Sequence, residues 1–160
     1  MSAPTAPEIE QWLQECLKLA KTAASEDEVP VGAIVIKEGV IIGRGYNRRE
    51  QDHNPVSHAE ITAIQEAAQH LKSWRLTDCT LIVSLEPCPM CLAACQQSRV
   101  DAVYYGAKDL KGGALSLGYL LHDNPKMNHR FKVLFQEQAD CGRILTDFFR
   151  AKRSLPPKSS

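Results

Sequence analysis

Residues 79–106, CTLIVSLEPCPMCLAACQQSRVDAVYYG, contain the pattern that decides the fold. Residues 79–85 have the apolar, β-branched composition of a buried strand, and residues 101–106 have that of a second strand. Residues 88–98 between them predict a short helix. Parallel strands need a long crossover, and a helical crossover is right-handed in nearly all proteins. The segment therefore predicts a βαβ unit with two parallel strands.

The flanking sequence predicts further elements of both kinds. Apolar residues recur with a helical period over residues 8–25 and again over 61–71, where Ser57 is placed to cap the helix near its start. Two short β-branched runs, 31–36 and 40–42, enclose Glu38-Gly39, which predicts a β-hairpin. A last strand over 131–136 and a helix over 140–153 complete the chain.

The connection over residues 107–130 is much longer than a hairpin loop. Its length permits the fifth strand to lie parallel to the fourth, whereas a short turn would force an antiparallel pair. Gly112-Gly113 and Asn124-Pro125 indicate loop, and the apolar run 115–121 is compatible with a helix. We therefore expect a three-layer α/β/α fold: a five-stranded mixed sheet, its last two strands parallel, with helices on both faces.

Length and composition indicate one globular domain. The chain has 160 residues, of which 44% are hydrophobic. We expect the domain to span residues 8–153, between a disordered lead over 1–7 and a disordered tail over 154–160. No apolar run is long enough for a membrane span, and the N-terminus has neither the basic nor the apolar part of a secretory signal. No membrane association and a cytoplasmic location are the expectation.

The charges are balanced overall but unevenly distributed. The formal net charge is zero, yet residues 121–160 hold eight Lys/Arg against four Asp/Glu. A local basic surface attracts phosphate, and basic residues at a helix end are also favoured by the helix dipole. Both interpretations of this segment stay open. Its basic residues are mainly Lys126, Arg130, Lys132, Arg143, Arg150, Lys152 and Arg153.

Two short motifs supply the residues of a catalytic metal site. His58-Ala59-Glu60 and Pro87-Cys88-Pro89-Met90-Cys91 provide one imidazole and two thiols, and catalytic zinc takes three protein ligands and keeps one open position. We predict one Zn²⁺ per subunit on His58, Cys88 and Cys91. A closed structural site with Cys95 as fourth ligand is the alternative, but seven residues of helix separate Cys95 from Cys88 by about 10 Å.

The remaining cysteines suggest no disulfide scaffold. Six cysteines in a chain of this length are too few for a stapled domain. Free cysteine behaves as a small buried hydrophobe. We expect this of the four that carry no metal, which are Cys16, Cys79, Cys95 and Cys141.

The order H-x-E…P-C-x-x-C resembles the signature of zinc enzymes that deaminate nucleobases. That resemblance implies a hydrolytic deamination with zinc-bound hydroxide as nucleophile. Glu60, two residues from the histidine, would take the water proton, pass it to a ring nitrogen and deliver a proton to the departing amine. In this interpretation Glu60 is the catalytic residue and no metal ligand.

Further motifs resemble the bacterial tRNA-specific adenosine deaminases over residues 8–153. The resemblance implies a cytidine deaminase-like fold and a homodimer that converts the wobble adenosine of a tRNA anticodon stem-loop to inosine, with an arginine tRNA of ACG anticodon as the suggested partner. The motifs are Pro30-Val31-Gly32-Ala33, Gly43-x-Gly45-x-Asn47, the two zinc motifs with Leu85-Glu86 ahead of the second, Gly106-Ala107-Lys108-Asp109, Met127-Asn128-His129-Arg130 and Phe148-Phe149-Arg150.

The same resemblance implies the substrate contacts. Asn47 would contact the inserted nucleoside, although without the resemblance it is more typical of a turn after a strand. Loop residues would line the anticodon loop, and residues of the last helix would contact phosphate or stack on a base. These are Asp109, Asn128, His129 and Arg130 in the loops, and Phe149, Arg150 and Arg153 on the helix.

Two other functions compete with this one. A small-molecule deaminase of the same superfamily, acting on guanine, cytosine or cytidine, would share the zinc chemistry. The long 107–130 connection disfavours the cytidine type, and the basic last helix disfavours a free-base enzyme. A non-catalytic zinc module that binds RNA is the second alternative, and it has no use for Glu60.

Overall fold

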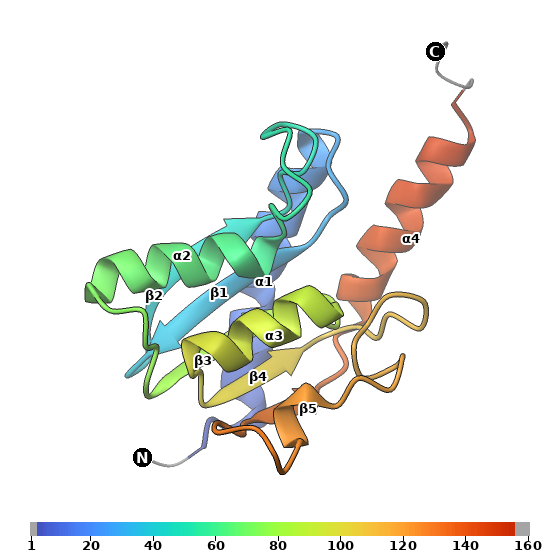
Figure 1. Cartoon of the computed structure of the whole chain (residues 1–160). Helices are drawn as coiled ribbons and strands as arrows, with labels where there is room; N and C mark the ends of the chain where they lie inside the picture. Colours follow the sequence, from blue (N-terminus) through green and yellow to red (C-terminus); the bar gives the residue numbers. More distant parts are fainter. Residues whose placement is uncertain (1–2, 156–160) are drawn as a thin grey trace.

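A computed structural model describes residues 3–155 as four helices, one 3-10 turn and five strands (Figure 1). In chain order these are α1 (Ala6–Ser25), β1 (Gly32–Lys37), β2 (Val40–Tyr46), α2 (Ala59–Leu71), β3 (Cys79–Val83), α3 (Pro89–Ser98), β4 (Ala102–Tyr105), η1 (Leu121–Asp123), β5 (Lys132–Phe135) and α4 (Ala139–Arg153).

The five strands form one mixed sheet in the order β2-β1-β3-β4-β5. β1 is antiparallel to β2 and to β3, while β4 is parallel both to β3 and to β5. The hairpin, the parallel βαβ pair and the parallel fifth strand are thus confirmed. The long connection before β5 brings the chain back to the end of the sheet at which β4 begins, as a parallel β5 requires.

Helices cover both faces of the sheet (Figure 1). Because successive side chains of a strand point to opposite faces, Val35 and Leu81 pack with α2 and α3, whereas Ile34 and Ile82 pack with α1. These alternating residues are all fully buried. The predicted three-layer cytidine deaminase-like fold is confirmed.

Helix α2 lies close to β2 because two glycines leave room for it. A Cβ at Gly45 would overlap the carbonyl oxygen of Ala59, and one at Gly43 would overlap that of Ala63. Ala59 is the first residue of α2. The glycines therefore set where the helix that carries His58 and Glu60 begins relative to the sheet.

The starts of two helices differ from the sequence-based expectation. α1 begins at Ala6, so the end of the predicted lead is helical; Thr5 is its N-cap and accepts from the Glu8 N–H at 3.4 Å. The prediction of Ser57 as a cap is wrong, because His58 is the N-cap residue of α2 and the Ser57 hydroxyl donates to Asp52 at 3.2 Å.

The apolar run 115–121, which is compatible with a helix from its sequence, does not form one. Only residues 121–123 make a 3-10 turn, and Gly118 has a positive φ of 86° that interrupts a right-handed helix. At the end of the chain, α4 stops at Arg153, and residues 156–160 of the predicted tail lie outside the described residues.

The cysteine prediction is confirmed, since all four non-motif cysteines are buried with free thiols. No helix within residues 3–155 combines the length and the apolar character that a membrane crossing requires.

Candidate active site

The first residues of α2 and α3 bring the two motifs together. His58 is the N-cap of α2 and Cys88 the N-cap of α3, with Cys91 one turn further along α3. Pro89 occupies the first turn of α3, where its missing N–H leaves no intrahelical bond unmade. Helix N-termini carry unpaired N–H groups and partial positive charge, which favour anionic ligands such as thiolates.

The three donor atoms fit one tetrahedral zinc ion. His58 Nδ1 lies 3.5 Å from Cys88 Sγ and 3.4 Å from Cys91 Sγ. Tetrahedral bonds of about 2.3 Å to sulfur and about 2.0 Å to nitrogen place such ligands about 3.5 Å apart. Within residues 3–155, these three residues form the cluster whose ligand atoms lie within 4.8 Å of one another. Cys95 is not part of it, which argues against a closed four-ligand site.

The two thiols differ in acidity. Hydrogen bonds from Cys91 and His58 lower the pKa of Cys88 to about 4. The hydrogen bond to Cys88, together with burial, raises the pKa of Cys91. Cys88 is therefore a thiolate at neutral pH, in the form that binds metal.

Glu60 lies in the first turn of α2 beside this cluster. Its side chain is 4% exposed. Burial raises the pKa of Glu60 to about 7, against the hydrogen bonds from its own backbone N–H and from Cys91. A buried carboxyl group next to three metal ligands, and outside the cluster itself, is placed to exchange protons with whatever occupies the open metal position.

A cavity of about 200 Å³ opens in front of these residues, and we call it the central cavity. It holds most of the chemistry predicted from the sequence: the metal ligands His58 and Cys88, together with Glu60, Asn47 and Asp109. The other lining residues are Val29, Val31, Arg49, Ala59, Leu85 and Glu86.

The loop after β2 forms one wall of the central cavity. Asn47 is buried there; its Nδ2 donates to the Val29 carbonyl at 3.4 Å and its Oδ1 accepts from the Arg49 N–H at 3.4 Å. Glu28, 1% exposed, accepts from the backbone N–H groups of Glu50 at 3.1 Å and Gln51 at 2.8 Å. A buried carboxylate thus holds this loop from behind.

The segment after β4 forms the opposite wall. Glu86 is 3% exposed and accepts from Asp109 N–H at 3.1 Å and from Ser116 N–H at 2.9 Å. The Ser116 hydroxyl donates to Glu86 at 2.7 Å. This second buried carboxylate holds the wall that carries Asp109.

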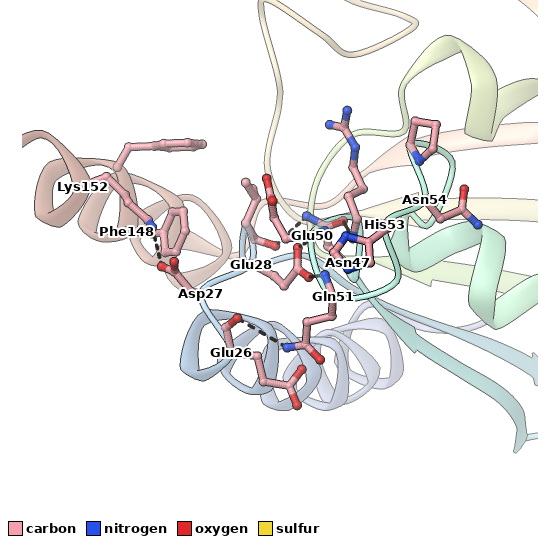
Figure 2. A pocket seen from close by; sticks show the side chains of 14 residues that line it. Glu26, Asp27, Glu28, Asn47, Glu50, Gln51, His53, Asn54, Phe148 and Lys152 are labelled. Carbon is pink, nitrogen blue, oxygen red and sulfur yellow. Dashed lines mark hydrogen bonds and ion pairs between the residues drawn. The ribbon is translucent and has the colours of Figure 1, made fainter. Parts of the chain in front are cut away.

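A wider groove of about 790 Å³ adjoins the central cavity and shares Val29, Asn47 and Arg49 with it. We call it the outer groove. Figure 2 shows Phe148 and Lys152 of α4 on one side and His53 and Asn54 of the β2–α2 loop on the other. Lys152 forms an ion pair with Asp27, which also lines the outer groove. The Lys152 Nζ lies 5.6 Å from the Phe148 ring centroid.

Of the remaining predicted contacts, Phe149 lines a hollow and the others do not. Phe149, 44% exposed, lines the outer groove, but Arg150 and Arg153 on α4 are exposed and line neither hollow. Asn128 and Arg130 are also exposed on the loop before β5.

His129 has structural partners. Its Nε2–H donates to the Val100 carbonyl at 2.7 Å, and its ring stacks on Phe131 at 5.7 Å between centroids.

Glu28, Val29, Arg49 and Glu86 are among the residues at the site that had not been singled out from the sequence as site residues. Arg49 follows Asn47 closely, and Glu86 directly precedes Pro87, so proximity to the motifs was the available signal. Nothing local indicated that Glu28 and Glu86 would each bind a loop more than twenty residues away.

Comparison with known proteins agrees with this geometry. A family model described as MafB19-like deaminase matches residues 8–153. A tRNA-specific adenosine deaminase of Streptococcus pyogenes serotype M18 (strain MGAS8232) is 44% identical over 153 residues, which cover 92% of this chain and 94% of the relative.

Two solved structures share the fold. One, from biochemical and structural studies of A-to-I editing by tRNA:A34 deaminases at the wobble position of transfer RNA, has a TM-score of 0.74 and 37% identity, covering 79% of this chain and 97% of its own. A guanine deaminase from Bacillus subtilis has a TM-score of 0.61 and 31% identity, covering 94% and 97%. The chain therefore belongs to the MafB19-like deaminases and, among them, to the tRNA-specific adenosine deaminase family.

Proposed function

We propose that this enzyme hydrolyses the wobble adenosine of a tRNA anticodon loop to inosine and releases ammonia. The observation that carries the proposal is the buried Glu60 beside a three-residue metal cluster at the end of the central cavity. The 44% identity to a tRNA-specific adenosine deaminase supports the substrate class. The structure from studies of tRNA:A34 deaminases supports the wobble position.

His58, Cys88 and Cys91 would hold one Zn²⁺ per subunit. When bound, such a zinc ion acts as a Lewis acid and lowers the pKa of a water molecule to about 7. The cluster would supply three ligands, and because neither Glu60 nor Cys95 belongs to it, one position on the ion would stay open for that water.

Glu60 would carry the protons of the reaction. Its carboxylate takes a proton from the attacking water and delivers it to N1 of adenine while the water oxygen bonds to C6. The second water proton then passes through Glu60 to the amine on C6, whose bond to carbon breaks. Water and adenosine are thus consumed, and inosine and ammonia are formed, without any other reactant.

A single-stranded anticodon loop suits the two hollows. An unstacked base can enter the central cavity, where Asn47 and Asp109 line the wall, while flanking nucleotides follow the outer groove toward Phe149. The exposed Arg150 and Arg153 of α4 and Asn128, His129 and Arg130 would contact the rest of the loop.

The finer features follow from the family resemblance. We propose that the enzyme acts as a homodimer in the cytoplasm and that its substrate is an arginine tRNA with the anticodon ACG.

A guanine deaminase activity is the second candidate, supported by the 31% identity to the Bacillus subtilis guanine deaminase. Both activities would use His58, Cys88, Cys91 and Glu60 in the same way. They differ in whether a free base or a nucleotide within RNA reaches the central cavity.

A substrate panel tests the proposal. We expect inosine from an anticodon stem-loop with a wobble adenosine, and none from free adenosine, guanine or cytidine. Glu60→Ala should abolish the product, while the control Glu66→Ala, on the exposed side of the same helix, should keep it. If guanine is deaminated and the stem-loop is not, the enzyme is a guanine deaminase and the proposed substrate is wrong. If zinc-loaded protein acts on none of the four compounds, the non-catalytic RNA-binding module is favoured.

A further inference from the structure

Glu86 is a buried acidic residue with no part in the proton transfer. It follows β3 and stands two residues before the metal ligand Cys88. Its carboxylate lines the central cavity, yet both oxygens accept hydrogen bonds from one segment of the chain, residues 109–116. We propose that Glu86 is a positioning residue for the substrate, which holds this segment so that Asp109 faces the central cavity.

Backbone hydrogen bonds add to the side-chain contacts between Glu86 and this part of the chain. Besides the three donors to its carboxylate, the Glu86 N–H donates to the Ala107 carbonyl at 2.8 Å and the Ala114 N–H donates to the Pro87 carbonyl at 2.8 Å. A Cβ at Gly113 would overlap the Glu86 carboxylate. The glycine therefore allows the segment to lie directly on this side chain.

Asp109 owes its place to this anchor and to its own turn. Its Oδ1 accepts from the N–H groups of Lys111 at 3.2 Å and Gly112 at 3.0 Å. Its backbone N–H donates a hydrogen bond to the Glu86 carboxylate. The Asp109 side chain thus stabilises a local turn. Glu86 holds that turn against the segment that joins β3 to Cys88.

Burial makes the anchor specific for a carboxylate. A buried ionised group is costly unless donors surround it, and here the three donors meet two oxygens. A glutamine at this position would offer one oxygen and one NH₂ group, so at least one N–H of the segment would face another donor. The segment should then loosen while the metal ligands on α3 keep their place.

The kinetic test rests on the proposed function. With the stem-loop as substrate, we expect Glu86→Gln to raise KM by about tenfold, the cost of one unmatched buried donor, and to change kcat by less than about threefold. Ser116→Ala removes a single donor and should raise KM by about threefold. The control is Ser98→Ala, a buried hydroxyl at the far end of α3 that donates to Cys95, and its KM should not change.

A double-mutant cycle separates positioning from general destabilisation. If Glu86 acts through Asp109, Glu86→Gln should raise KM by less than about twofold in an Asp109→Asn background. If the increases in KM caused by Glu86→Gln and by Asp109→Asn multiply in the double variant, the two residues act independently and the proposal is wrong. A fall in kcat of Glu86→Gln as large as its rise in KM would also overturn the proposal.

Amide hydrogen exchange tests the same contacts without any substrate. In the zinc-loaded protein, Glu86→Gln or Ser116→Ala should speed exchange at Asp109 and Ser116 by about tenfold and leave the amides of α3 unchanged. Unchanged exchange at these two amides would overturn the proposal whatever the enzyme turns over. A stem-loop left untouched by wild-type enzyme would instead count only against the proposed function.

Discussion

Two buried carboxyl groups, Glu60 and Glu86, line the same cavity and are equally hidden, at 4% and 3% exposure. Their partners differ. Glu60 has its own N–H and Cys91 as partners, and burial raises its pKa to about 7. Glu86 accepts three hydrogen bonds from one wall segment. Burial alone therefore does not define a role: a sparsely bonded carboxyl is available for proton exchange, and a fully bonded one is an anchor.

The largest expected effect is on kcat, when Glu60, the proposed proton carrier, is replaced. Glu60→Gln keeps the shape of the side chain but cannot carry a proton, so kcat on the stem-loop should fall by about 10²–10⁴-fold. Zinc content, measured by elemental analysis, should stay at the wild-type level. Loss of the metal from this variant would mean that Glu60 is a ligand and that its assigned role is wrong.

The next effect concerns the metal cluster, which lies beside Glu60. Cys88→Ala should lose zinc, and with free zinc at about 1,000 times its Kd the lost binding is worth about 4 kcal/mol of stability. At about 2–4 °C per kcal/mol, the Tm should fall by roughly 8–16 °C. Cys95→Ala, which removes a buried thiol on the same helix, should retain one zinc per chain; its loss would revive the four-ligand site.

Thermal stability of the metal-free protein sharpens the comparison further. Glu86→Gln leaves a buried N–H unmatched and should cost about 1–3 kcal/mol, a fall in Tm of about 2–12 °C. Glu60→Gln removes a buried charge with few partners, so its Tm should be equal to or above that of the wild type. Differential scanning calorimetry of both variants measures this, and equal falls would show that the two carboxyl groups have similar structural roles.

The smallest effect is expected at the outer groove. Phe149→Ala should raise KM for the stem-loop by about tenfold through lost base stacking, with the Tm within about 1 °C of the wild type because the ring is exposed. Leu155→Ala, another exposed apolar residue just past α4, serves as control and should leave KM unchanged. A fall in Tm with no change in KM would make Phe149 a packing residue.

The core of the site was predictable because its signal is local. Each motif is short, and together the histidine, the two cysteines and the carboxylate resemble the zinc deaminase signature, which predicted that they would meet although 30 residues separate His58 from Cys88. The sheet followed from strand periodicity and from the length of the 107–130 connection. Each motif and each strand depends on residues near one another in the sequence, and the structure confirms the sheet.

The walls of the cavity were not predictable, because their contacts join distant segments. Glu86 bonds residues 23 and 30 positions later, and Glu28 bonds residues 22 and 23 positions later. A long-range contact also decides the apolar run 115–121, whose sequence is compatible with a helix. The Ser116 N–H donates to Glu86 and Gly118 has a positive φ, so no helix forms there.

The most direct test of the difference between the two carboxyl groups is a single-turnover experiment with zinc-loaded enzyme and saturating stem-loop. Saturation removes any defect in binding, so the rate of inosine formation reports the chemical step alone. We predict that Glu60→Gln slows this rate by about 10²-fold or more, while Glu86→Gln stays within about threefold of the wild type. Equal losses in both variants would contradict the assignment of proton transfer to Glu60 and positioning to Glu86.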